Sequence, residues 1–185
     1  MKHFVRKLFV NPDKEEQWLN EMAGKGLGLE RCSFCKYEFV EIKPGAYTYK
    51  VQLLEEDADT TKSQEYLQFL EEMDITCVTR YRQWIYLRKA AVNGPIELYS
   101  DIDSKLSYYK KVHYFYWSWI YIELGAGVLN VLAIKNLSNG RFSSMNRLNL
   151  VVGLLILLCI GIFAYADYPI AKQIKGLEDE RKIKE

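Results

Sequence analysis

The sequence predicts an α+β fold: a ferredoxin-like β-α-β-β-α-β sandwich followed by a two-helix transmembrane hairpin. Two observations predict this architecture. In the first half of the chain, segments rich in β-branched and aromatic residues alternate with segments whose apolar residues recur at helical spacing. In the last third, Val112–Ile134 and Leu148–Ala166 are each apolar and long enough to cross a hydrocarbon core, which takes ~20 residues of helix.

The first strand and the first helix are predicted from residues 3–23. His3–Val10 is rich in β-branched and aromatic residues, as strands are. Asn11 is a good helix N-cap, and Pro12 suits the first helical position. An apolar stripe at helical spacing follows, made of Trp18, Leu19, Met22 and Ala23. The glycine-rich run 24–28 ends this helix.

A pair of strands is predicted next. Leu29–Ile42 is one extended stretch, and Lys43–Ala46 has the composition of a turn. In Tyr47–Leu53, bulky residues alternate with polar ones at the strand period of two. These segments therefore predict a hairpin joined by a Pro-Gly turn.

The second half of the domain repeats the helix–strand alternation. Thr61 and Gln64 match a helix capping box after the solvated acidic loop Glu55–Asp59. The helix stripe is Tyr66, Leu67, Leu70 and Met73. Ile75–Ala90 is extended and is expected to bend near Arg82-Gln83 into two short strands. Helices on one face of a single sheet would complete a ferredoxin-like sandwich.

A linker helix is predicted over Ile96–Lys111, started by Pro95 and able to continue into the first membrane helix. The predicted domain organisation is a cytosolic domain over 1–92, a linker helix over 93–111, transmembrane helices over 112–134 and 148–168, an external loop over 135–147 and a charged tail over 169–185.

The charge distribution predicts the membrane orientation. Residues 1–100 hold 14 basic and 16 acidic side chains, and residues 101–185 hold 11 and 8. Eight Lys and Arg flank the apolar pair on its outer sides, against three in the connecting loop, which favours a multi-pass cell-membrane protein with both termini cytoplasmic. Charges interrupt Met1–Val10, so no cleavable signal peptide is expected.

Glu123 is the most informative polar residue in the apolar segments. A carboxylate near the middle of a membrane helix costs ~2.5–3.5 kcal/mol on insertion scales, so it needs a partner or a role. Asn130 lies two helical turns further on, and Gly125 and Gly127 would let another helix approach closely. We therefore predict a membrane helix interface at Glu123, Gly125, Gly127 and Asn130, with ion or proton handling by Glu123 as the alternative.

No catalytic, metal or cofactor site is predicted. Cys32 and Cys35 lie three apart in a predicted strand, so their thiols should point to opposite faces, which argues against a redox pair or a zinc site. The two histidines, His3 and His113, are far apart in the sequence, and no nucleophile–base motif is present. The nearly neutral front domain lacks the clustered basic face of a nucleic-acid-binding protein.

Three motifs within residues 1–90 together resemble a known family. In order they are Trp18-Leu19-Asn20-Glu21-Met22-Ala23-x-x-Gly26, Tyr47-x-Tyr49-x-Val51 and Trp84-Ile85-Tyr86-Leu87-Arg88-Lys89. They resemble an uncharacterised bacterial family of unknown function, DUF2812 type, common in Gram-positive species. Its members are often encoded beside PadR-type repressors, and several carry a C-terminal transmembrane pair. The resemblance implies a membrane protein in a regulated envelope response and transfers no catalytic residue.

The sequence thus predicts a non-enzymatic regulatory or sensory interaction protein tethered to the bacterial membrane. The alternative is a small subunit of a membrane transporter or channel that uses Glu123. Its expected partners are the lipid bilayer, a membrane or cytosolic protein, and further copies of itself; no nucleic acid and no cofactor is expected.

Overall fold

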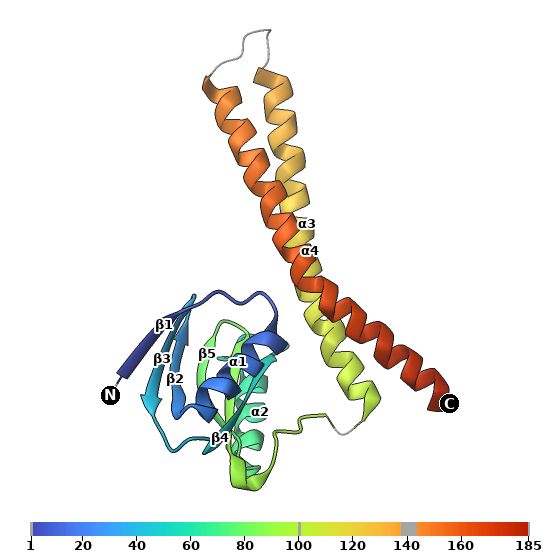
Figure 1. Ribbon diagram of the computed structural model, residues 1–185. Coiled ribbons are helices and arrows are strands. Elements are labelled where there is room, and N and C mark those ends of the chain that lie inside the picture. The colour runs from blue at the N-terminus through green and yellow to red at the C-terminus, as the bar shows by residue number, and fades with distance from the viewer. Residues whose placement is uncertain (1, 100, 138–143, 185) are drawn as a thin grey trace. The chain divides into compact units, whose positions relative to one another are not determined.

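The computed structural model describes residues 2–99, 101–137 and 144–184 (Figure 1). The chain forms two compact units, Met1–Asp101 and Ile102–Glu185. The first unit contains β1 (Lys2–Arg6), α1 (Pro12–Gly24), β2 (Leu27–Ser33), β3 (Lys36–Glu41), β4 (Tyr47–Leu53), α2 (Thr61–Glu72), β5 (Thr76–Tyr81), β6 (Trp84–Ala90) and the 3-10 turn η1 (Ala91–Asn93). Helix α1 begins as predicted, because the Asn11 side chain accepts hydrogen bonds from the first backbone N–H groups.

The strands of the first unit form two three-stranded antiparallel sheets, with the orders β1-β3-β2 and β4-β6-β5. Each sheet is built from a β-α-β-β segment in which the last strand lies in the middle. Each also has a bulge at the same place in its hairpin, between Leu29 and Arg31 in the first and between Cys77 and Thr79 in the second. The two halves of the domain therefore follow one structural plan.

The two sheets meet at β2 and β5. There the backbone N–H of Cys32 donates to Oγ1 of Thr79 at 3.4 Å, while each strand keeps its ladder within its own sheet. Thr79 is the residue that follows the bulge in β5, so its side chain is available to bridge the two sheets.

Helix α1 packs between side chains from both sheets. Leu19 and Ala23 on α1 are almost completely buried. The core around them takes Leu29 and Phe39 from the first sheet, and Val51 and Tyr86 from the second. The apolar stripe predicted on this helix therefore faces the main core.

Helix α2 covers the opposite face of the second sheet. Leu70 of α2 packs with Ile85 and Leu87 of β6, whereas Tyr86 between them belongs to the core around α1. This alternation follows from the strand period of two, which sends successive side chains to opposite faces. The second sheet is thus buried on both faces.

The mixed α+β class is confirmed, but the ferredoxin-like topology predicted from the sequence is not the one observed. Leu29–Ile42 contains a hairpin, β2–β3, that turns at Phe34-Cys35, where Cys35 has a φ of 56°. As a result β3 and β4 do not pair with each other but belong to different sheets, and the two helices cover opposite faces of the second sheet. The bend expected near Arg82-Gln83 is confirmed as the turn between β5 and β6.

The segment after η1 packs onto the first unit instead of starting a helix. The predicted linker helix was to begin at Ile96, but the structure has no helix over residues 94–99. Ile96 is buried in the core under α2, and the amide of Gln52 donates to the hydroxyl of Tyr99 at 3.1 Å. The apolar side chains of Ile96 and Leu98 therefore pack on the domain core and not on a face of a linker helix.

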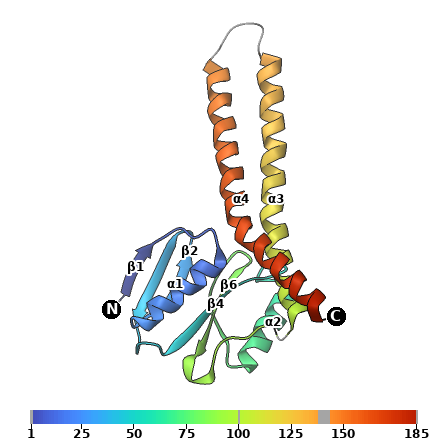
Figure 2. The ribbon, with the colours of Figure 1, turned by 45° about the vertical axis from the view of Figure 1, so that its right-hand side comes forward.

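The second unit is a pair of long helices, α3 (Ile102–Leu137) and α4 (Ser144–Lys184), which pack against each other (Figure 2). Helix α3 runs without a break through the predicted boundary at residues 111–112. Helix α4 continues past the predicted membrane segment through the charged tail, and Figure 1 shows it bending in the part that contains Pro169. Of the predicted external loop over 135–147, residues 138–143 lie outside the described residues.

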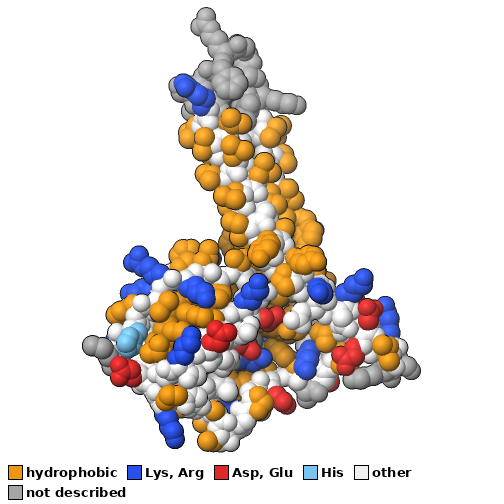
Figure 3. Space-filling view, viewed as in Figure 1, with side chains coloured by type: hydrophobic (Ala, Val, Ile, Leu, Met, Phe, Trp, Pro, Cys, Tyr) orange, Lys and Arg blue, Asp and Glu red, His pale blue; other side chains and the backbone are white. Residues whose placement is uncertain are grey.

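Large apolar side chains remain exposed along both helices (Figure 3). Among the described residues, α4 holds the one candidate membrane span, within Arg147–Ile183, and no residue of its most apolar stretch is buried. Helix α3 is less apolar because Glu123, Asn130 and several Tyr and Trp side chains interrupt it. By length and composition, the described part of the chain therefore contains one helix able to cross a membrane by itself.

Candidate functional site

One face of α3 lies against α4 and carries most of the predicted interface. Glu123, Gly127 and Asn130 are spaced four and three residues apart, so they share this face, and all three are half-buried. Gly125 is exposed, and a side chain added there would meet nothing within 4 Å. The structure thus brings three of the four predicted interface residues together and leaves Gly125 on the outer surface.

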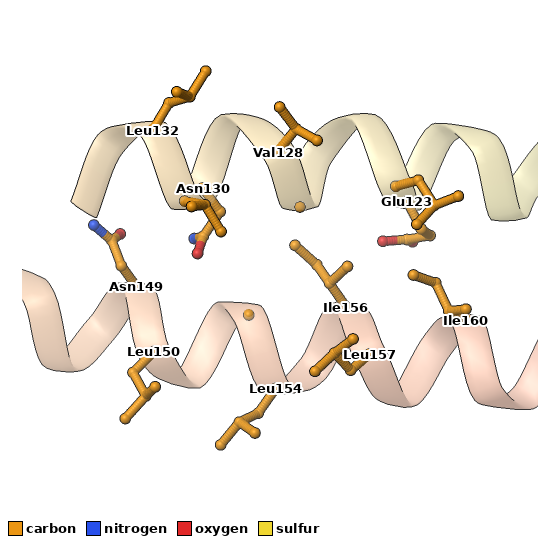
Figure 4. A pocket seen from close by; sticks show the side chains of 14 residues that line it. Glu123, Val128, Asn130, Leu132, Asn149, Leu150, Leu154, Ile156, Leu157 and Ile160 are labelled. Carbon is orange, nitrogen blue, oxygen red and sulfur yellow. The ribbon is translucent and has the colours of Figure 1, made fainter. Parts of the chain in front are cut away.

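A cavity of about 510 Å³ lies between the two helices at this face (Figure 4). Glycines create part of the space: a Cβ at Gly127 would lie 3.7 Å from Ile156, and one at Gly153 would lie 3.5 Å from Oδ1 of Asn130. Glu123 stands toward one end of the cavity, and Asn130 and Asn149 stand toward the other (Figure 4). The remainder of the lining is almost entirely aliphatic.

The three polar side chains of the cavity have no partner within the described part of the chain. Neither hydrogen bond nor ion pair joins Glu123, Asn130 or Asn149 to another described group. An unpaired polar group is costly in an apolar environment, because nothing replaces the water that it has lost. The polar groups of Glu123, Asn130 and Asn149 are therefore open to an occupant of the space between the helices.

A second polar cluster joins α3 and α4 and was missed by the sequence analysis. Asp167 on α4 is 6% exposed, and its two carboxylate oxygens lie 2.7 Å from Nδ1 of His113 and 3.0 Å from Nε1 of Trp117. One sequence pattern could have indicated this cluster: His113 and Trp117 are four residues apart, so their side chains lie on the same face of α3.

Ion pairs join the charged ends of the same two helices. Lys110 lies 2.8 Å from Glu178, and Arg181 lies 3.3 Å from Asp103. The charged end of α4 therefore packs beside the beginning of α3. The N-terminal part of α3 and the C-terminal part of α4 thus lie at the same end of the helix pair.

The α+β domain holds a buried carboxyl group in its main core. Oε1 of Glu15 accepts hydrogen bonds from the hydroxyls of Tyr37 at 2.6 Å and Tyr86 at 2.7 Å. Burial raises the pKa of Glu15, and it raises the pKa of the neighbouring Cys32 thiol to about 11. A thiol with that pKa is protonated at neutral pH and is a poor nucleophile.

The two cysteines of the Cys32–Cys35 pair occupy different environments. Cys32 is buried in β2, whereas Cys35 lies in the hairpin turn and is half-buried. Within the ranges that the structure describes, no group of three or more His, Cys, Asp or Glu side chains is placed to hold a metal ion. The strand predicted to carry both cysteines ends before Cys35.

Comparison with known proteins identifies the family. A family model described as a protein of unknown function (DUF2812) matches residues 11–121, more than half of the chain. This chain belongs to the DUF2812 family. The match confirms the family suggested by the three sequence motifs; it includes the Glu15 cluster, His113 and Trp117 but ends before Glu123. No curated protein and no solved structure matches the chain.

Proposed function

We propose that this DUF2812 protein is an integral membrane protein with a regulatory or sensory role, in which α3 and α4 together cross the bilayer and hold the α+β domain on the cytoplasmic side. The observation that carries the proposal is the apolar surface of the helix pair. Leu129 on α3 and Leu157 on α4 are 69% and 65% exposed. Soluble monomers rarely leave large contiguous apolar surfaces in water.

The inclusion of α3 in the membrane is supported by its packing. A helix that lies along α4 through the apolar region shares the same environment, and Ile122, Val128 and Leu129 on α3 are all exposed. Polar Asn130 and Glu123 on the same helix face α4 rather than the surroundings. This is the distribution expected of a helix in lipid.

The proposed orientation rests on loop charges and on the ion pairs at one end of the helices. Eight basic residues lie on the outer sides of the two apolar stretches, before the one in α3 and after the one in α4. Three basic residues lie between the two stretches. The Lys110–Glu178 and Arg181–Asp103 pairs join those outer segments at one end of the pair. By the positive-inside rule that end is cytoplasmic.

The proposed role is interaction and not catalysis. The most chemically distinctive groups of the domain, Glu15, Tyr37 and Tyr86, are buried and bonded to one another, so they offer little to a substrate. A ligand-responsive or partner-binding role requires no reactive group. We propose a membrane or cytosolic protein as the partner, with a regulated envelope response as the setting that the family resemblance implies.

The first experiment tests membrane insertion. Membranes from cells that express the full chain are extracted with alkaline carbonate and then with detergent. The proposal expects the chain to resist carbonate and to dissolve in detergent, and reporter fusions at both termini to be active in the cytoplasm. Recovery of the chain as a monodisperse, detergent-free monomer would reject it.

A second candidate function is that of a transporter or channel subunit. It is favoured by one observation: Glu123, Asn130 and Asn149 face a cavity within the helix pair. Two helices enclose no continuous pore, so this role needs several copies or a larger partner. Flux in reconstituted vesicles that disappears in Glu123→Gln would favour transport, whereas co-purification of a defined partner with unchanged flux would favour the interaction role.

A further inference from the structure

The cavity between α3 and α4 has a polar group at each end and an apolar middle. The carboxylate of Glu123 marks one end, and the side-chain amides of Asn130 and Asn149 mark the other (Figure 4). Glu123 and Asn130 are seven residues apart, which is ~10 Å along a helix that rises 1.5 Å per residue. Ile156 lies between them (Figure 4), and Gly127 and Gly153 also line the cavity.

The chain itself does not satisfy these polar ends. Within the described residues, Glu123, Asn130 and Asn149 make no hydrogen bond and no ion pair. In the apolar surroundings of a bilayer such groups favour an occupant that supplies the missing partners. At Glu123 the complementary group is a cation that donates hydrogen bonds, which is an ammonium.

The shape of the cavity favours a small molecule over a further helix. A helix with its side chains is ~10 Å wide and needs a groove on the outside of the pair. Here the polar side chains point between the two helices. Val128, Leu154 and Leu157 also line the cavity but are exposed, so a partner helix on the outside of the pair would meet their aliphatic side chains before the polar groups. A volume of about 510 Å³ lies within the range of small-molecule sites.

We propose that this cavity binds a lipophilic amine, whose ammonium pairs with Glu123 and whose apolar body lies along Gly127, Ile156 and Gly153. A hydrogen-bonding group at the far end of such a ligand would meet Asn130 and Asn149. The inference rests on the proposed function, because it needs the helix pair to be in a bilayer, where amphiphilic amines concentrate. If the protein has the proposed sensory role, lipophilic amines are the class of ligand that it would sense.

The test uses the full chain in phosphatidylcholine nanodiscs, titrated calorimetrically with octylammonium chloride after subtraction of empty nanodiscs. Octylammonium carries the charge on an apolar chain of ~10 Å, matching the distance between the polar ends. We expect saturable binding, a Kd at least about tenfold weaker in Glu123→Gln, and much weaker binding of neutral octanol to the wild type.

A pair of glycine variants tests the position of the site. Gly127→Leu places a side chain in the cavity, and we expect it to abolish octylammonium binding. Gly125→Leu adds the same side chain two residues away on the outer surface, and its Kd should stay within about twofold of wild type. If Gly127→Leu disturbs the helix pair, Glu123→Gln still tests the charge at nearly unchanged volume.

The possible outcomes separate this inference from the proposed function. A chain that inserts into nanodiscs but shows no saturable octylammonium binding, or equal Kd in wild type and Glu123→Gln, overturns the amine site alone. Crosslinked dimers that depend on Glu123, without amine binding, also overturn it and make a second copy the occupant. A chain that stays in water as a monomer overturns the membrane proposal, and with it the amine site.

Discussion

At the scale of single residues, the α+β domain depends on a carboxyl group in its interior. Glu15 comes from α1, Tyr37 from β3 and Tyr86 from β6, so this cluster joins the helix to both sheets. Burial also raises the pKa of both tyrosine hydroxyls, and the adjacent carboxyl reinforces the shift. The phenols therefore remain hydrogen-bond donors across the physiological pH range.

The first prediction is a pH dependence of domain stability that Glu15→Gln removes. Burial raises the pKa of Glu15 above its ordinary value of 4.5, so the native state binds this proton more tightly than the unfolded state. The contribution of Glu15 to the free energy of unfolding is fully present below the ordinary carboxyl pKa. It is lost as the pH rises through the raised pKa of the folded state. Glutamine does not ionise, so the variant should gain stability relative to wild type as the pH rises.

The measurement is the free energy of urea unfolding from about pH 4 to pH 8, followed by tryptophan fluorescence. The raised pKa values of Asp13 and Glu16 have the same sign and are present in both proteins, so the difference isolates Glu15. Parallel stability curves for wild type and variant would count against the shift.

The second prediction concerns Asp167. Asp167→Ala leaves the ring N–H groups of His113 and Trp117 without their acceptor, so the α3–α4 pair should lose about 1–3 kcal/mol. Thermal unfolding of the chain in detergent, followed by circular dichroism, measures the loss. Ser118→Ala is the control, because its exposed hydroxyl bonds only within α3 as far as the structure describes, and it should change the midpoint little.

Sequence reasoning reached these residues only in part. Helical spacing placed Glu123 and Asn130 on one face of α3, and the structure puts both in the cavity. It gave no partner for Asp167, because His113 lies 54 residues away and spacing identifies a face of a helix but not the helix opposite. The Glu15 cluster was also missed, since its three members come from separate elements.

At the scale of elements, α1 protects the open edge of the second sheet. Strand β4 is an edge strand, and the Asn20 side chain accepts from the N–H of Tyr49 at 2.8 Å and donates to its C=O at 2.9 Å. Oε2 of Glu16 accepts from the next outward N–H, that of Val51. Side chains of a helix thus take the place of a neighbouring strand, which blocks pairing with another chain.

The third prediction is that Asn20→Ala lowers the unfolding free energy by about 1–3 kcal/mol and promotes self-association, because two backbone groups of Tyr49 lose their partners. Denaturant titration gives the first effect and light scattering the second. Gln17→Ala, at an exposed position of the same helix, should be neutral in both assays. Equal behaviour of the two variants would show that the edge is stable without this cap.

The fourth prediction concerns the turn between β2 and β3. Cys35 has a φ of 56°, a conformation that costs a side chain roughly 1 kcal/mol relative to glycine. Cys35→Gly should therefore raise the unfolding free energy by about that amount. Cys35→Ala removes the thiol but keeps the strain, and should give no such gain in the same denaturant titration.

This turn also explains why the topology was predicted wrongly. Phe34-Cys35 contains no glycine, proline or asparagine, so Leu29–Ile42 looked like one long strand. The strong signal at Pro44-Gly45 does mark a turn, but it connects two sheets and not two paired strands. Glycine and proline therefore identified one turn of the chain and missed another, and they left open which strands pair.

At the scale of the whole molecule, a folded α+β domain is continuous in sequence with a helix pair that has an apolar exterior. The sequence predicted a front domain over 1–92 and apolar helices from 112, because hydropathy over ~20 residues is a strong signal, whereas the two compact units divide after Asp101. The sequence predicted two membrane spans, whereas among the described residues only α4 is long and apolar enough to be a candidate. Helix α3 carries polar side chains that face α4, and hydropathy alone does not distinguish an inward-facing from an outward-facing polar residue.

The fifth prediction is that a charge on the outer surface of the helix pair prevents insertion. Leu158 is 60% exposed, and Leu158→Arg should cost ~2.5–3.5 kcal/mol of insertion energy near the middle of the span. The fraction that resists carbonate extraction should fall sharply. Leu148→Arg, beside Arg147 at the end of the apolar stretch, should insert almost normally, and equal loss in both variants would argue against a bilayer location.

The matching bulges of the two hairpins have a consequence for the origin of the domain. A single β-α-β-β segment would leave one side of its helix bare, since α1 needs Val51 and Tyr86 from the other half to complete its core. The core under α2, in contrast, contains no residue of the first segment, so the first segment depends on the second for its core. The repeated strand order and the matching bulges are what duplication and fusion of one ancestral β-α-β-β segment would produce.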